Sequence, residues 1–182
     1  MTDLAATGVA IRTLHRLAQV DVRLEPREVA AMERVAAALT ASLPAAPNTV
    51  ATATDGEGFV LWLGPDEWLV VGHEGSASVA PAIETAVRAA AAPAFLTTVD
   101  VSANRVVLEV TGPRARELLA FGCAIDLDPV SFGSGRCVQT LLARASVIVW
   151  QTDDAPTYRL LVRPSFVAYV VAWLDDAVAG LG

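Results

Sequence analysis

The chain has 182 residues and a mass of 19.0 kDa, which fits one domain or one domain built from two similar halves. Apolar residues make up 54% of the chain and charged residues only 18%, so either the core is dense or another subunit covers part of the surface. The net charge is −7 and all 13 basic residues are Arg. An acidic chain without Lys is a poor partner for nucleic acid, and it cannot support Schiff-base, pyridoxal phosphate or Walker-type phosphate-loop chemistry.

The N-terminal half is predicted to contain four extended segments and two helices. Residues 9–24 read as extended, because apolar and charged side chains alternate toward the end of this segment. Residues 27–43 are Ala-rich and amphipathic, which is typical of a helix, and Pro26 suits its start. The next predicted elements are strands at residues 49–54, 59–63 and 68–71, separated by turns, and a helix at residues 78–92.

The C-terminal half is predicted to have a similar order of elements. Residues 95–101 and 105–110 are expected to pair as a hairpin around residues 102–104, and Pro113 is expected to begin a third helix that ends near residue 121. The remaining predicted elements are an extended run at residues 137–150, read either as one strand or as two strands bent at 143–145, a strand at 158–163, and a last helix at 166–178 capped by Ser165.

This order of elements predicts an α+β fold. Strands joined by short turns favour mostly antiparallel sheets with helices packed on one face, rather than a doubly wound parallel sheet. We expect a single domain over residues 1–182, with approximate halves 1–94 and 95–182 that form an internal structural repeat.

No segment is predicted to span or anchor in a membrane. The strongest compact apolar run, residues 166–174, is about half as long as the roughly 20 residues that a spanning helix needs. The N-terminus carries Asp3 and no basic residue ahead of an apolar region, which argues against a signal peptide. We therefore expect a cytoplasmic location, in which Cys123 and Cys137 stay reduced; they form no CxxC pair that would favour structural zinc.

Candidate catalytic and metal-binding groups are sparse. His15 and His73, the two histidines, have no partner at metal-ligand spacing. Ser134 lies between Gly133 and Gly135, but the nucleophile elbow needs its glycines two residues away on each side, so a flexible turn is the better interpretation. We predict no catalytic, cofactor-binding or metal-binding residue in this chain.

The acidic pairs and tryptophans also favour structural roles. Asp126 and Asp128 are expected to cap turns rather than to act as an acid–base pair. The pairs at residues 153–154 and 175–176 are expected to be solvated. Trp68 is expected in the core, although its place beside a Gly-Pro turn would also suit contact with a partner.

Seven segments in order resemble the gamma subunit of heterotetrameric sarcosine oxidase. The order and spacing of the segments match this family from about residue 60 to residue 176, and the N-terminal third resembles it only in general terms. The segments are LGPDEWLV at residues 63–70, DVSANRV at 100–106, VTGPRARELL at 110–119, GCAIDLDP at 122–129, QTLLARA at 139–145, YRLLVRPSF at 158–166 and WLDD at 173–176.

The resemblance implies a fold like the folate-binding domain of the glycine-cleavage aminomethyltransferases. In that pattern a Gly-Gly turn is followed by an acidic pair that contacts folate. Residues 142–149 here read LARASVIV, so the Gly-Gly turn and the acidic pair are both absent. A pterin ring held in an apolar pocket needs an acceptor for its N–H groups, so the resemblance implies a scaffold without a working folate site.

The resemblance also implies a place in a larger complex. Such an oxidase demethylates sarcosine oxidatively to glycine and hands the one-carbon unit to tetrahydrofolate. The alpha, beta and delta subunits are the expected partners, and FAD, FMN, NAD and tetrahydrofolate are expected on those subunits, with no cofactor in this chain. This makes the chain a non-catalytic, structural subunit of an oxidoreductase.

Two alternatives stay open at this point. One is a free-standing module that binds folate or another small molecule, with a homodimer as one form of it. The other is a one-carbon transferase, against which the missing acidic pair argues.

Overall fold

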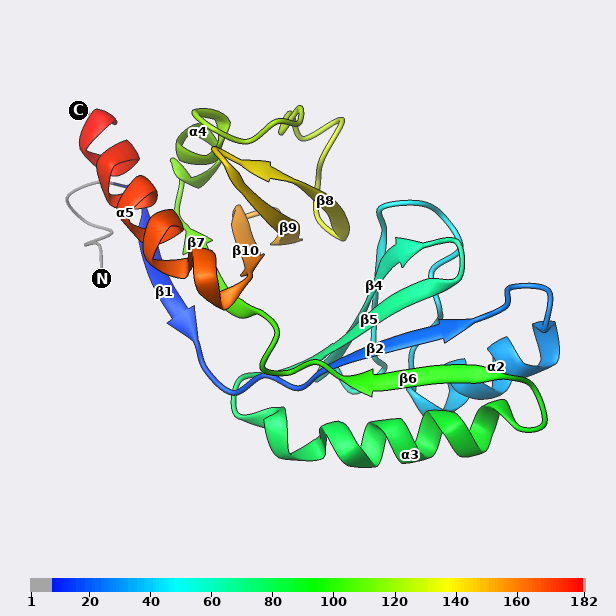
Figure 1. Ribbon diagram of the computed structural model, residues 1–182. Coiled ribbons are helices and arrows are strands. Elements are labelled where there is room, and N and C mark those ends of the chain that lie inside the picture. Colours follow the sequence, from blue (N-terminus) through cyan, green and yellow to red (C-terminus); the bar gives the residue numbers. More distant parts are fainter. Residues whose placement is uncertain (1–7, 182) are drawn as a thin grey trace. The chain divides into compact units, whose positions relative to one another are not determined.

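The computed structural model describes residues 8–181, which divide into two compact units (Figure 1). Unit 2 is His15–Ala103, and unit 1 combines residues 8–14 with residues 104–181. Each unit contains a five-stranded sheet in which every strand pair is antiparallel. The predicted α+β class with antiparallel sheets is confirmed.

Unit 2 contains one sheet and two α-helices. Its sheet has the strand order β3-β4-β5-β2-β6. The elements are β2 (Gln19–Leu24), α2 (Val29–Ala38), β3 (Val50–Thr52), β4 (Gly58–Gly64), β5 (Glu67–Gly72), the 3-10 turn η1 (Ser76–Val79), α3 (Ala80–Ala91) and β6 (Leu96–Asp100). Its core lies between the helices and the side chains Val20, Val22, Val60, Trp68 and Val70 of the sheet.

Unit 1 has the same construction. Its sheet has the strand order β8-β9-β10-β7-β1. The elements are β1 (Ala10–Leu14), β7 (Val106–Thr111), α4 (Ala115–Ala120), β8 (Arg136–Leu142), β9 (Ala145–Asp153), β10 (Thr157–Val162) and α5 (Pro164–Gly180). Leu118, Val170 and Leu174 of the helices pack with Leu108, Val149 and Leu160 of the strands.

The two strand orders reveal an internal repeat. In each unit a first strand, a helix, three strands in an antiparallel meander and a second helix follow one another along the chain. The first strand pairs with the third strand of the meander, which lies at the centre of the sheet. The fifth strand is β6 in unit 2 and β1 in unit 1. The compact units therefore group residues differently from the predicted halves 1–94 and 95–182, because β1 completes the sheet of the C-terminal unit and β6 that of the N-terminal unit. That the chain forms a single domain remains a prediction.

Two predicted local features are wrong. The segments 95–101 and 105–110 form no hairpin with each other, because β6 pairs with β2 and β7 pairs with β1 and β10. Pro113 lies before α4 rather than at its first position. Residues 9–24 are extended as predicted, but they form two strands of different sheets, separated where Arg16 has a φ of +59°.

The helix ends also differ from the expectation. The helix predicted at residues 27–43 is shorter, and the chain leaves it through Thr40, which has a φ of +51°. Ser165 does not cap α5, because Arg163 occupies the N-cap position and makes no capping bond with its side chain. Among residues 8–181, no helix combines the length and the apolar character that crossing a bilayer requires.

Candidate functional site

A cavity of about 460 Å³ opens at one end of the unit 1 sheet. It lies beside the β8–β9 hairpin, whose two-residue turn has a positive φ of +51° at Ala143. A positive φ at the first turn residue matches the twist of antiparallel strands, and Gly is the residue that usually supplies it. The residues that line the cavity are Arg105, Ala124, Gln139, Thr140, Leu141, Ser146, Val147, Ile148, Leu161 and Arg163.

Two arginines of this cavity come together through strand register. Val106 of β7 pairs with Val162 of β10, and these two residues form the last pair of that ladder. Arg105 and Arg163 are the next positions outward, and the backbone of Arg163 is still extended, with φ −61° and ψ 139°. Like charges on opposite positions of paired strands repel each other. Both arginines line the same cavity.

The other polar groups of the cavity are neutral. The Gln139 amide and the hydroxyls of Thr140 and Ser146 can donate hydrogen bonds, and no Asp or Glu is among the lining residues. A group of this kind suits a carboxylate or another oxyanion. It lacks the acidic acceptor that a pterin would need, and it contains no His, Cys or carboxyl group that could act as an acid or base near neutral pH.

Arg105 and Arg163 were not predicted as site residues. They are 58 positions apart by residue number, and the segments DVSANRV and YRLLVRPSF that contain them carry the family resemblance without marking either Arg as functional. The available signal was that one Arg directly precedes a strand and the other directly follows one. This signal becomes informative only when the antiparallel pairing of those strands is known.

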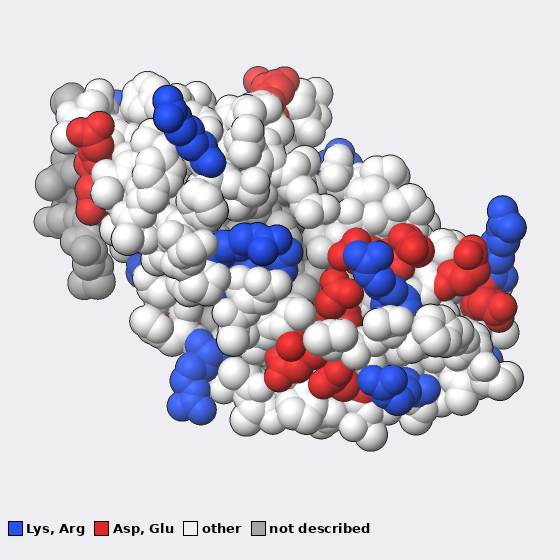
Figure 2. Space-filling model, viewed as in Figure 1, with Lys and Arg blue, Asp and Glu red and all other residues white. Residues whose placement is uncertain are grey.

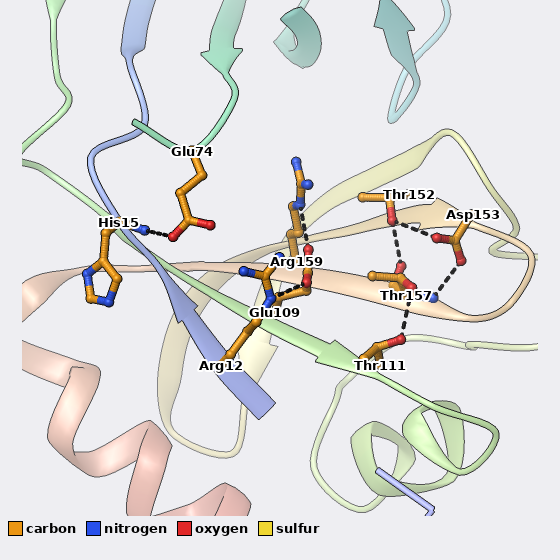
Figure 3. Close-up of polar contacts among 9 residues, drawn as sticks. All are labelled: Arg12, His15, Glu74, Glu109, Thr111, Thr152, Asp153, Thr157 and Arg159. Atoms are coloured by element: carbon orange, nitrogen blue, oxygen red, sulfur yellow. Dashed lines mark hydrogen bonds and ion pairs between the residues drawn. The ribbon is translucent and has the colours of Figure 1, made fainter. Parts of the chain in front are cut away.

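A second polar arrangement holds three strands of unit 1 together (Figure 3). The Glu109 carboxylate on β7 accepts hydrogen bonds from Nε of Arg12 on β1 at 2.8 Å and from Nε of Arg159 on β10 at 3.3 Å. The Arg159 guanidinium also lies 4.9 Å from the ring centre of Trp150. One carboxylate is shared by guanidiniums from the two neighbouring strands, which is typical of a structural tie between strands rather than of a reactive centre.

The predicted turn-capping role of the first acidic pair is confirmed. Asp126 accepts hydrogen bonds from the backbone N–H of Asp128 at 2.9 Å and from the Ser131 hydroxyl at 2.6 Å. These bonds stabilise the charged form and lower the pKa of Asp126, with the Ser131 hydroxyl as the largest cause. Asp128 in turn accepts from the backbone N–H of Val130. A carboxylate with a lowered pKa is a poor proton donor at neutral pH.

The remaining candidates also have structural surroundings. Trp68 is buried and its indole N–H donates to the carbonyl of Pro44, so its placement in the core is confirmed. The Ser134 hydroxyl donates to the carbonyl of Thr152, and neither histidine belongs to the same unit. In the β9–β10 turn, Asp153 accepts a hydrogen bond from the backbone N–H of Ala155 and one from that of Thr157, the second of which is drawn in Figure 3.

The histidines and cysteines do not assemble a metal site. Nδ1 of His73 lies 3.2 Å from a Glu57 carboxylate oxygen on an exposed surface, and the backbone N–H of His15 donates to Glu74 (Figure 3). Burial raises the pKa of the Cys123 thiol, which disfavours the thiolate needed for nucleophilic chemistry. Within the described part of the chain, no three His, Cys, Asp or Glu residues gather in a way that could hold a metal ion.

Comparison with known proteins decides the family. The family model described as the sarcosine oxidase, gamma subunit family matches residues 24–180. The chain belongs to this family. Curated relatives named sarcosine oxidase subunit gamma include one from Arthrobacter sp., 39% identical over 173 residues and covering 95% of this chain and 81% of the relative. Another, from Corynebacterium sp. strain U-96, is 36% identical over 172 residues, and the match covers 94% of this chain and 80% of that relative.

Solved structures agree with the family and with the fold. A chain of the heterotetrameric sarcosine oxidase from Corynebacterium sp. U-96, solved in complex with pyrrole 2-carboxylate, superposes with a TM-score of 0.84 at 34% identity and covers 97% of this chain and 91% of that chain. The glycine cleavage system aminomethyltransferase T from Bartonella henselae superposes with a TM-score of 0.63 at 11% identity over 94% of this chain and 47% of that one. The expected likeness to the aminomethyltransferase fold is confirmed.

Proposed function

We propose that this chain is a non-catalytic structural subunit of a heterotetrameric sarcosine oxidase. The observation that carries the proposal is the match of residues 24–180 to the gamma subunit family, together with the superposition on a chain of a heterotetrameric sarcosine oxidase. The composition of the cavity supports a role without catalysis, because its lining offers hydrogen-bond donors and cations but no acid or base.

The partners in this proposal are the alpha, beta and delta subunits of the oxidase. The complex would demethylate sarcosine oxidatively to glycine and transfer the one-carbon unit to tetrahydrofolate. FAD, FMN, NAD and tetrahydrofolate would bind on those subunits and not on this chain. A reducing, cytoplasmic compartment is part of the proposal, and the free thiols of Cys123 and Cys137 support it.

The exposed apolar side chains of unit 1 support a role in assembly. The exposed fraction is 56% for Phe121, 46% for Leu141, and 39% for both Phe166 and Tyr169. Helix α5 has 17 residues, of which only Val170 and Leu174 are buried, and it carries no charged side chain before Asp175. In Figure 2, acidic and basic side chains lie side by side over the strands of unit 2. The surface over the first half of α5, by comparison, is mostly uncharged.

The proposal is tested by co-expressing the tagged chain with the alpha, beta and delta subunits. We expect the three partners to co-purify with it and sarcosine oxidation to require the alpha and beta chains, whereas the chain alone should be colourless and inactive. A yellow isolated chain that absorbs near 450 nm would contradict the assignment of flavin to the other subunits. Recovery of the tagged chain without any partner would contradict the subunit role.

A second candidate is a free-standing module that binds a small molecule. The cavity supports it, because a volume of about 460 Å³ falls in the range of roughly 300–1,000 Å³ that is typical of ligand sites. The absence of a carboxylate from its lining disfavours folate as the ligand. Calorimetry with tetrahydrofolate distinguishes the two, since the subunit proposal predicts no binding at micromolar concentrations.

A further inference from the structure

A second cavity, of about 320 Å³, is lined by residues of unit 2 alone. The C-terminal end of α2, the β3–β4 turn, the end of β5 and the first turns of α3 form its walls. We infer that this cavity is a docking pocket for another subunit of the oxidase, which inserts one apolar side chain and places an Arg or Lys beside it on the rim. The inference rests on the proposed function and adds to it a surface of this chain and the chemistry that this surface recognises. The docking pocket has an interior lined by Leu39, Ala53, Val70 and Ile83 and a rim that contains Asp55 and Glu57.

The interior of the docking pocket is apolar. Ala53 and Val70 are buried, and Leu39 and Ile83 are half-buried. All four residues belong to the unit 2 core or pack against it, so the pocket leads from the surface to the core. An apolar side chain that enters such a pocket is removed from water on nearly all sides, which is the setting in which a single interface residue contributes most to binding.

The polar groups of the pocket are poorly placed to orient a small molecule. The Ser76 hydroxyl donates to the carbonyl of His73 at 2.6 Å and accepts from the backbone N–H of Ala18 at 2.9 Å, so its bonding capacity is already used. Sites for small molecules usually hold several polar groups at fixed positions among their apolar walls. A side chain carried by a partner needs no such groups, because the rest of the partner's surface orients it. The other polar side chains of the lining belong to exposed residues, which are Thr40, Asp55, Glu57 and His73.

The rim of the pocket is acidic. Asp55 and Glu57 lie in the β3–β4 turn and are exposed, and no Arg is among the described residues that line the pocket. Nδ1 of His73 lies 3.2 Å from a carboxylate oxygen of Glu57, and this imidazole is charged only when it is protonated. Two carboxylates are therefore matched by at most one cation, which leaves the rim with a negative charge. A partner that brings an Arg or Lys to this point gains an electrostatic attraction and a faster association.

Hydrogen bonds fix the walls of the pocket. The backbone N–H of Thr54 donates to the carbonyl of Thr40 at 2.9 Å, which ties the β3–β4 turn to the end of α2. Within the turn, the Asp55 carboxylate accepts from the backbone N–H of Glu57 at 2.9 Å. The pocket is thus formed before a partner arrives, and binding to a preformed surface costs less conformational entropy than binding to a mobile one.

This chemistry favours a different subunit over the other occupants. A second copy of this chain would bring a further net charge of −7 against the first, and the two copies would repel each other. A small apolar amine would match the charge of the rim, but no group inside the pocket would fix its orientation. A subunit that presents an apolar side chain next to an Arg or Lys satisfies both the interior and the rim.

The test is a competition for incorporation into the complex. The wild-type chain and a variant that carries a different tag are co-expressed with limiting amounts of the alpha, beta and delta subunits, and mass spectrometry of the purified complex gives the ratio of the two chains. Ala86→Phe fills the pocket from α3, and Glu57→Arg reverses one charge of the rim. Each variant should enter the complex about tenfold less than the wild type or worse, as expected when an apolar or a charged anchor is lost.

The matched controls make the same changes outside the pocket. Ala89→Phe places the ring at an exposed position of α3, and Glu33→Arg reverses an exposed charge on α2. Neither residue lines the pocket, so both controls should enter the complex like the wild type. All four isolated variants should melt like the wild type, because each changes an exposed residue and the Glu57–His73 pair is an exposed ion pair that contributes little stability.

Lower incorporation of both Ala86→Phe and Glu57→Arg, with undiminished stability, supports the docking pocket. If either variant enters the complex as well as the wild type, the docking pocket is wrong while the proposed function stands. If the wild-type chain itself enters no complex, the proposed function fails. Lower incorporation accompanied by a lower melting temperature in both variants would overturn the docking pocket in favour of a purely structural role.

Two measurements on the isolated chain identify the other occupants. A homodimer that both Ala86→Phe and Glu57→Arg dissociate would assign the pocket to a second copy. Saturable binding of phenethylamine in calorimetry, abolished by Ala86→Phe although this variant still enters the complex normally, would assign the pocket to a small amine. Either result would overturn the docking of another subunit.

Discussion

Replacing Gly122 by Ala should destabilise unit 1 for a purely steric reason. A Cβ at this position would lie 2.4 Å from Cζ2, 2.9 Å from Cη2 and 3.2 Å from Cε2 of the Trp173 indole. Carbon atoms in optimal contact are about 3.5–4.0 Å apart, so the ring or the backbone must move by about 1 Å or more. The φ of Gly122 lies outside the left-handed region, so backbone strain contributes nothing to the expected cost.

The expected magnitude follows from the rigidity of the indole. Trp173 packs against the unit 1 core, and an added carbon atom in such a setting typically costs about 1–3 kcal/mol. We therefore expect Gly122→Ala to lower the free energy of unfolding by about 2 kcal/mol, measured by urea denaturation. The control is Gly180→Ala near the end of α5, where an added Cβ meets no atom within 4 Å and the stability should be unchanged or slightly raised.

A double-mutant cycle identifies the cause. In a Trp173→Leu background the obstacle is smaller, so the additional cost of Gly122→Ala should largely disappear. The steric reasoning would be refuted if Gly122→Ala were as stable as the wild type, or if it cost the same free energy in both backgrounds.

Three further predictions concern the ion cluster, the hairpin turn and the Asp126 loop. Glu109→Gln removes the carboxylate that pairs with the guanidiniums of Arg12 and Arg159, so it should lower the free energy of unfolding by about 1–3 kcal/mol in urea denaturation. The control Arg27→Gln should leave the free energy of unfolding unchanged. Ala143→Gly should raise the free energy of unfolding by up to about 1 kcal/mol, since Gly adopts the φ of +51° without the penalty of a Cβ. A lower stability of this variant would mean that Ala143 is not strained in the turn. Ser131→Ala should raise the pKa of Asp126 toward its ordinary value, as measured by carboxyl-carbon NMR titration. Because folding lowers the pKa of Asp126, its hydrogen bond from Ser131 stabilises the protein at pH values above the unfolded-state pKa, and this stabilisation is lost as the pH falls through the folded-state pKa. The wild type and Ser131→Ala should therefore converge in stability at acid pH.

Much of the local structure was predictable because it depends on neighbouring residues. The β4–β5 hairpin, the position of Trp68 in the core and the capping by Asp126 all follow from periodicity and turn chemistry. Residues 137–150 were predicted only as an extended run with a bend, whereas the structure has the β8–β9 hairpin there. The hairpin predicted for residues 95–110 failed because alternation predicts a strand but not its partner. Asp100 accepts hydrogen bonds from the backbone N–H and the hydroxyl of Ser102, and the chain then continues into the other sheet instead of turning back.

The site was less predictable because it depends on long-range register. β1 and β7 pair although the whole of unit 2 separates them in sequence. Arg105 and Arg163 become neighbours only through the pairing of β7 with β10. The composition pointed either to a dense core or to apolar surface covered by another subunit, and it gave no indication of where the exposed apolar residues would lie.

The most direct test of the central claim is native mass spectrometry of the tagged chain purified after co-expression with the alpha, beta and delta oxidase subunits. The subunit role predicts a single major assembly with one copy of each of the four chains, and a melting temperature of this chain that rises when the partners are added. A monomer or homodimer of this chain alone, with a melting temperature that the partners leave unchanged, would contradict it.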